Sequence, residues 1–191
     1  ITENESSPTV TLATSATSIA ENAGSSLTLT ATSSIVADEA ITVTIGTSGT
    51  GTEGTDYSTI SDITISAGAT TGTASFTPTD DSIFEGDETG IVAITGVSGA
   101  DAAESGSQSV TITITDNETT APKVTLTSSA SSIAENSGSS ITLTATLSVA
   151  TTADVTVGLS KDSGAATEGT DFNNLSDITV TAGNTTGTTS F

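Results

Sequence analysis

Apolar and polar residues alternate with a period of two along most of the chain. Leu27, Leu29 and Ala31 are separated by Thr, and Ile41 and Val43 follow the same pattern. Such alternation predicts strands with one buried face and one face in water, and the intervening Thr residues favour an extended backbone through β-branching. No segment shows the 3.6-residue spacing of an amphipathic helix. The pattern predicts strands at 8–13, 26–34, 40–47, 62–66, 72–78, 89–97 and 107–116.

Seven short strands in about 110 residues predict an all-β fold, an antiparallel immunoglobulin-like β-sandwich. If the strands run alternately down and up, three of the loops and the end of the last strand meet at one end of the sandwich. These segments carry ten carboxylates: Glu21, Glu53, Asp56, Asp80, Asp81, Glu85, Asp87, Glu88, Asp116 and Glu118. The whole chain offers only Lys123 and Lys161 as cations. Because crowded like charges repel, the sequence predicts that something else neutralises this end.

The chain also contains an internal repeat, which predicts tandem sandwiches. Three segments return further along the chain: Pro8–Leu12 as Pro122–Leu126, Ser18–Asn22 as Ser132–Asn136, and Thr52–Tyr57 as Thr167–Phe172. We therefore expect residues 1–5 to end a preceding repeat, residues 6–118 to form a complete repeat, and residues 119–191 to form a second repeat that lacks its last strands. Two interpretations remain open, a window of a longer array and a filament subunit whose second repeat is completed by strands of the next subunit.

The composition of the chain limits the ligands that it can bind. The chain has 191 residues with 44 Thr, 30 Ser, 23 Asp plus Glu and a formal net charge of −21. Without basic surface it has nothing to neutralise phosphates, so we expect no binding to nucleic acid. No run of 18 or more apolar residues occurs, so we expect no direct insertion into a membrane. His and Cys are absent, so a metal site must use oxygen ligands. Ca²⁺ accepts six to eight oxygen ligands in a tolerant geometry, whereas Mg²⁺ demands a tight octahedron, and the predicted cofactor is Ca²⁺.

Five separated motifs, in order and in register, resemble the Calx-beta domain: Ser18–Asn22, Gly54–Tyr57, Ile63–Gly68, Asp80–Glu88 and Ile112–Glu118. The resemblance implies tandem immunoglobulin-like sandwiches that bind Ca²⁺ at one end. It implies the metal ligands Glu21, Asp56, Asp80, Asp81, Glu85, Glu88 and Asp116, and their counterparts Glu135 and Asp171 in the second copy. Asn117 stands where the family often carries a further acid, which weakens one ligand position.

From these features we expect a structural role and no catalytic activity. The chain would form a calcium-rigidified rod of a cell-surface adhesin or filament, outside the cell, with neighbouring repeats or identical subunits as partners. Alternatives are a strand-donating filament subunit, an adhesive module that contacts a ligand directly, and an acidic surface that is merely solvated. A glycosidase-like pair of carboxylates is the enzymatic alternative, against which stand the repetition of the motif and the scarcity of aromatic residues.

Overall fold

The computed structural model describes residues 6–118 and 120–191. The chain forms two compact units, the first made of residues up to Asp81 together with Gly86–Asn117, and the second of Ser82–Glu85 and Glu118–Phe191. The predicted end of a preceding repeat, at residues 1–5, lies outside the described residues. The described part of the chain has no helix that is long and apolar enough to cross a membrane.

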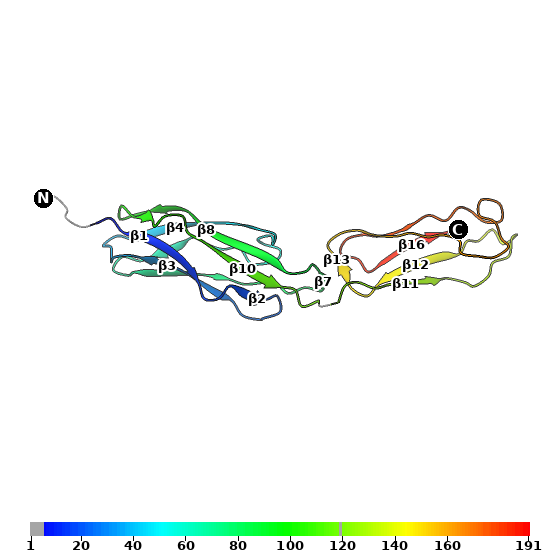
Figure 1. The fold of residues 1–191 in the computed structure, drawn as a ribbon, viewed down its shortest axis with the longest axis horizontal. Helices are drawn as coiled ribbons and strands as arrows, with labels where there is room; N and C mark the ends of the chain where they lie inside the picture. Colours follow the sequence, from blue (N-terminus) through cyan, green and yellow to red (C-terminus); the bar gives the residue numbers. More distant parts are fainter. Residues whose placement is uncertain (1–5, 119) are drawn as a thin grey trace. The chain divides into compact units, whose positions relative to one another are not determined.

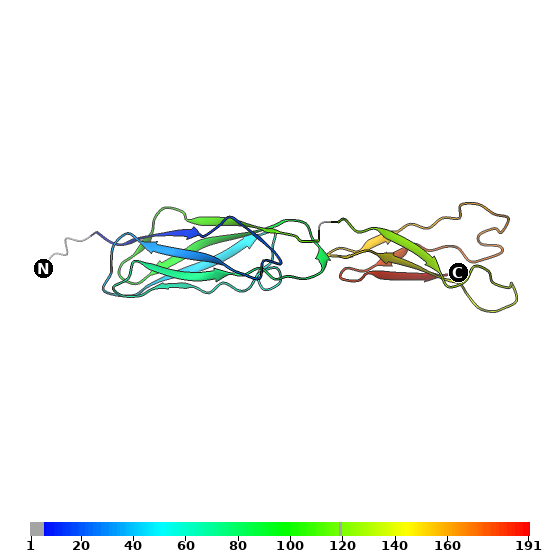
Figure 2. The same ribbon diagram turned by 90° about the horizontal axis from the view of Figure 1, so that it is seen from below.

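The first unit is a sandwich of two sheets, as the alternation predicts. One sheet has the order β6-β3-β1-β9 and the other the order β2-β10-β8-β4-β5. The strands are β1 (Thr9–Thr14), β2 (Ser18–Ala20), β3 (Leu27–Ser33), β4 (Ile41–Gly49), β5 (Ile63–Ile65), β6 (Thr71–Phe76), β8 (Glu88–Ser98), β9 (Ala103–Glu104) and β10 (Ser109–Thr115). In both views they run along the length of the unit, so the loops gather at its two ends (Figures 1 and 2).

The inward positions of both sheets form one core. Val10, Leu29 and Phe76 come from the first sheet and Val43 and Ile112 from the second, and all five are at most 1% exposed. The Thr residues between them turn mainly outward, which is why a chain so rich in Thr still folds into a sandwich. The ring of Tyr57 stacks on Phe76 with 4.6 Å between centroids, so Tyr57 plugs the core as an aromatic side chain.

Strand β2 is not predicted by the periodicity, because Ser18–Ala20 shows no alternation of apolar and polar residues. Residues 18–20 were expected in a loop, but they pair in parallel with β10, with Ala20 opposite Thr115. Strand β1 belongs to the opposite sheet, where it pairs with β3. The chain therefore crosses from one sheet to the other between Thr14 and Ser18, and this crossing brings Glu21 to the end of β10.

The second unit has a smaller core. Strands β11 (Val124–Ser128), β12 (Thr142–Leu147) and β16 (Thr186–Ser190) form one sheet, and β14 (Val155–Val157) pairs with β15 (Ile178–Val180). The two-residue strand β13 (Ala150–Thr151) pairs in parallel with β7 (Ile83–Phe84). Ala145, Leu147, Ile178 and Val180 are the buried cluster of this unit.

Three apolar residues of the second unit are exposed although their counterparts in the first unit are buried. Val124, Leu126 and Ile133 are 44%, 51% and 43% exposed, whereas Val10, Leu12 and Ile19 are 0%, 7% and 8% exposed. In the first unit this face is covered by β8 and β10. No described strand of the second unit takes their place.

Gly90 of β8 lies against the aromatic core, and its replacement tests that packing. A Cβ on Gly90 would lie 2.7 Å from Phe76, whereas a Cβ on Gly96 of the same strand would meet Thr44 at an ordinary 3.7 Å. We expect Gly90→Ala to lower the free energy of unfolding by about 1–3 kcal/mol and Gly96→Ala to change it by less than about 1 kcal/mol. Tyr57 is the sole tyrosine and Trp is absent, so tyrosine emission in a denaturant titration reports on the first unit alone. Equal effects of the two substitutions would contradict this packing.

Candidate metal centre

The register between β2 and β10 places two acids side by side. Ala20 lies opposite Thr115, and the next residues along the two parallel strands are Glu21 and Asp116. The Glu21 N–H donates to the carbonyl of Thr115 at 3.0 Å, which holds the turn in that register. The side chain of Glu21 is only 5% exposed, and one of its oxygens lies within 4.8 Å of a carboxylate oxygen of Asp116.

The segment that follows β6 adds further carboxylates. The Asp81 N–H donates to Oε1 of Glu21 at 2.9 Å, and carboxylate oxygens of Asp81 and Glu21 lie within 4.8 Å of each other. Asp80 lies close enough for its charge to act on Glu21. Where the chain re-enters the first unit, the Gly86 N–H donates to Oδ2 of Asp116 at 2.6 Å. Backbone hydrogen bonds thus hold the carboxylates of Glu21 and Asp116 in place.

Glu88 and Asp56 form a second close pair. Glu88 is the first residue of β8, where it pairs with Ile114 of β10, and Asp56 lies in the turn after β4. The turn is shaped by hydrogen bonds from the N–H groups of Thr55 and Asp56 to the carbonyl of Thr52. Carboxylate oxygens of Asp56 and Glu88 lie within 4.8 Å of each other, and both side chains are half-buried.

Burial and mutual repulsion act on the protonation of this group. Burial, followed by the charges of Asp81, Asp116 and Asp80, raises the pKa of Glu21, although the hydrogen bond from the Asp81 N–H works in the opposite direction. Burial also raises the pKa of Glu88, with the charge and hydrogen bond of Asp56 as the next causes. Both carboxylates therefore lie where a negative charge is disfavoured unless a cation is present.

The sequence places four further acids near this end: Glu53, Glu85, Asp87 and Glu118. Glu53 accepts hydrogen bonds from the Thr47 hydroxyl and the Ile60 N–H, both at 2.6 Å, so its two oxygens fix the turn before Asp56. Asp87 is exposed and accepts a hydrogen bond from the Asp116 N–H at 3.2 Å. Glu85 and Glu118 are half-buried and belong to segments grouped with the second unit.

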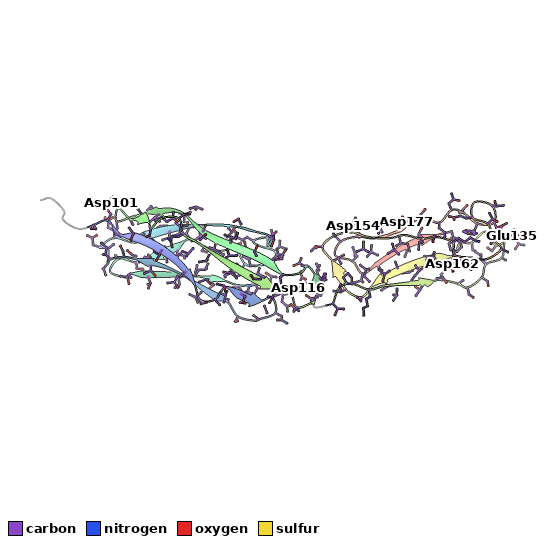
Figure 3. All side chains as sticks on the ribbon, in the orientation of Figure 1. Asp101, Asp116, Glu135, Asp154, Asp162 and Asp177 are labelled. Atoms are coloured by element: carbon purple, nitrogen blue, oxygen red, sulfur yellow. The ribbon has the colours of Figure 1, made fainter. Side chains whose placement is uncertain are left out.

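The counterparts in the second copy are not brought together. Glu135 and Asp171 are exposed, and among the described residues no group of three ligand-type side chains includes either of them. One oxygen of Asp171 accepts a hydrogen bond from the Thr167 N–H at 2.7 Å, so the turn around it is formed. Glu135 and Asp154 lie at opposite ends of this unit (Figure 3).

The donor set of the first unit fits Ca²⁺. We use the name acidic cluster for six side chains: Glu21, Asp56, Asp80, Asp81, Glu88 and Asp116. Asp116 and Asp101 lie at opposite ends of the first unit (Figure 3). Two oxygens that bind one Ca²⁺ at 2.3–2.6 Å are at most about 5 Å apart, which matches the three close pairs. Residues 6–118 contain no Lys, Arg or His that could neutralise the cluster instead.

The chain is similar in sequence and in fold to known proteins of one family. The family model of the Calx-beta domain matches residues 3–118 and again 117–186. The apo-form Calx CBD1 domain is 18% identical, with a TM-score of 0.48 over 57% of this chain and 98% of its own. CBD12 from CALX1.2 is 15% identical, with a TM-score of 0.48 over 94% of this chain and 73% of its own. The calcium binding domain CBD12 of CALX1.1 is 17% identical, with a TM-score of 0.47 over 94% and 74%. No curated protein matches the sequence.

The raised pKa of Glu21 predicts how the metal-free protein responds to pH. The folded first unit binds this proton more tightly than the unfolded chain, so its stability is greatest below the ordinary pKa of 4.5 and falls as the pH rises through the raised value. In chelator at pH 7, Glu21→Gln should therefore unfold at a higher temperature than wild type and depend less on pH.

The matched control is Glu39→Gln, which removes the same charge from an exposed position. Thermal unfolding between about pH 4 and 8, followed by tyrosine emission, measures both variants. A steeper pH dependence in Glu21→Gln than in wild type would contradict the assignment, as would equal stabilisation by Glu39→Gln.

Proposed function

Since the chain belongs to the Calx-beta family, we propose that its first unit binds Ca²⁺ at the acidic cluster and that tandem units form a calcium-rigidified rod. The observation that carries the proposal is the position of Glu21. Its carboxylate is 5% exposed and faces Asp81 and Asp116 in a repeat without any cationic side chain. A bound divalent cation is the chemistry that turns this repulsion into attraction.

The proposed role is mechanical. The linker Glu118–Pro122 is short and ends in a proline, which restricts the angles that two repeats can adopt. Without Ca²⁺, charge repulsion around the acidic cluster keeps the joint loose, and ion binding reduces that repulsion. A stalk of a surface adhesin or filament, outside the cell, requires this stiffness. Its partners would be neighbouring repeats or identical subunits.

Calcium should stabilise the first unit and magnesium should do so much less. An ion that binds only the folded state adds about 2.7 kcal/mol at a concentration of 100 times its Kd. We therefore expect the thermal midpoint of the 191-residue chain, read from tyrosine emission, to rise on replacing chelator with millimolar Ca²⁺. The same concentration of Mg²⁺ should raise it far less, because Mg²⁺ gives up its water reluctantly.

Two variants localise the effect. Asp116→Asn keeps the size and a carbonyl oxygen but removes one charge from the acidic cluster, and it should lose most of the calcium-induced rise. Asp62→Asn removes a charge from a carboxylate that accepts a hydrogen bond from the Ile45 N–H, away from the cluster, and should keep the rise. No rise in the wild type, or an equal rise in both variants, would leave the cluster a solvated acidic surface.

A second candidate function is a filament subunit whose second unit is completed by strands of a neighbouring copy. Val124 and Leu126 lie on β11 and are exposed where the first unit covers Val10 and Leu12 with β8 and β10. A face of this kind accepts two strands with alternating Val and Ile, as in donor-strand complementation. The same strands can come from a following segment of the same chain or from a neighbouring copy, so the source of the strands distinguishes the two candidates.

The mass of the native surface polymer under denaturing conditions separates the two candidates. A calcium-rigidified array predicts a polypeptide many repeats long. If the polymer instead dissociates under denaturing conditions into single chains of about 191 residues, the strand-donating subunit is established.

A further inference from the structure

The segment Val36–Ala37 of the first unit has a counterpart in the second unit that pairs with another strand. The internal repeat shifts residues 36–37 by 114 positions, onto Ala150 and Thr151. These two residues are β13, and they pair in parallel with Ile83 and Phe84 of β7. By sequence, Ile83–Phe84 belongs to the acidic loop of the preceding repeat, so the second repeat holds a piece of the repeat before it.

The two edges have the same local geometry. The Gly68 N–H donates to the carbonyl of Ala37 at 2.8 Å, and the corresponding Gly183 N–H donates to Thr151 at 2.8 Å. The two edges differ in solvent exposure, because Val36 is 60% exposed while Ala150, at the same position of the repeat, is 7% exposed. No described strand pairs with Val36–Ala37. The edge is thus formed and uncovered.

We propose that Val36–Ala37 is the docking edge for the Ile83–Phe84 segment of a preceding copy of this repeat, in register with the β7–β13 pair. The inference rests on the proposed function in one respect, that the repeat stands in a tandem array. Two residues of parallel pairing supply the backbone hydrogen bonds. The apolar side chains of Ile83 and Phe84 would cover Val36 and the neighbouring Ile35, which is 38% exposed.

Charge argues for a preceding repeat in the same polypeptide over a free molecule. The hollow beside Val36 is lined by Pro8 and Val97 and also by the acids Asp38, Glu39 and Asp101. The incoming Ile83–Phe84 is itself flanked by Asp81 and Glu85, so like charges oppose the encounter. A short linker overcomes this by its effective concentration, which a separate chain in dilute solution lacks.

Engineered disulfides test the docking, because the chain has no Cys and any disulfide must be the designed one. The test protein is the full chain with an extra copy of residues 6–118 joined by its Glu118 to Ser6. This junction reproduces the Glu-Ser-Ser-Pro spacing of Glu5–Pro8. It carries Ile83→Cys in the added copy and Val36→Cys in the following repeat, and equilibrium with glutathione gives the effective concentration of the two thiols.

Two further proteins serve as the positive control and as the background of this experiment. The observed pair, Ile83→Cys with Ala150→Cys in the 191-residue chain, is the positive control. Replacing Val36→Cys by Thr11→Cys, at an exposed position of β1, gives the background. We expect the Val36 pair to come within about tenfold of the positive control and to exceed the Thr11 pair by about 100-fold or more. A value at the Thr11 background would overturn the proposal, and so would a positive control at that background.

Measuring in both calcium and chelator separates this inference from the proposed function. A high effective concentration in both conditions, together with no calcium effect on the thermal midpoint, would keep the docking and reject the metal site. A calcium effect with only background cross-linking at Val36 would keep the metal site and reject the docking.

Discussion

The parallel pairing of β2 with β10 is the contact on which the acidic cluster depends. Ile19 and Ile114 are opposite each other in this pair and are 8% and 4% exposed, so burial of apolar side chains fixes the register. One consequence cannot be avoided in that register, because Glu21 and Asp116 follow directly and must lie together. The free energy of the core thus brings acids together that would repel each other on a free loop.

Because of that constraint, the stability of the fold is linked to the binding of a cation. Glu21 is nearly buried, its pKa is raised, and residues 6–118 contain no cationic side chain to offset it. A repeat with this sequence is less stable as a metal-free protein than its core alone would allow. In the proposed function, calcium would act as a component of the fold, and the stiffness of a tandem array would depend on the ion.

Periodicity predicted seven strands of the first repeat, including the three-residue β5, because apolar and polar residues alternate in each of them. It missed β2, β7 and β9, which have two or three residues and owe their geometry to a partner strand. The alternating strand directions predicted that Glu21, Asp81 and Asp116 lie near one another, as the structure has them. The sequence could not show that both carboxylate oxygens of Glu53 accept hydrogen bonds from Thr47 and Ile60. The pairing of β7 with β13 could not be predicted either, since Ile83–Phe84 lies within the acidic loop and shows no periodic signal.

Whether the acidic cluster holds Ca²⁺ is tested most directly by a crystal structure of the 191-residue chain grown in millimolar calcium. We expect an anomalous difference peak with oxygens of Glu21 and Asp116 at about 2.3–2.6 Å from it, and Asp81 in contact with the same ion or its neighbour. A map without such a peak, in which these carboxylates point into solvent, would contradict the account and leave the sandwich fold as its surviving part.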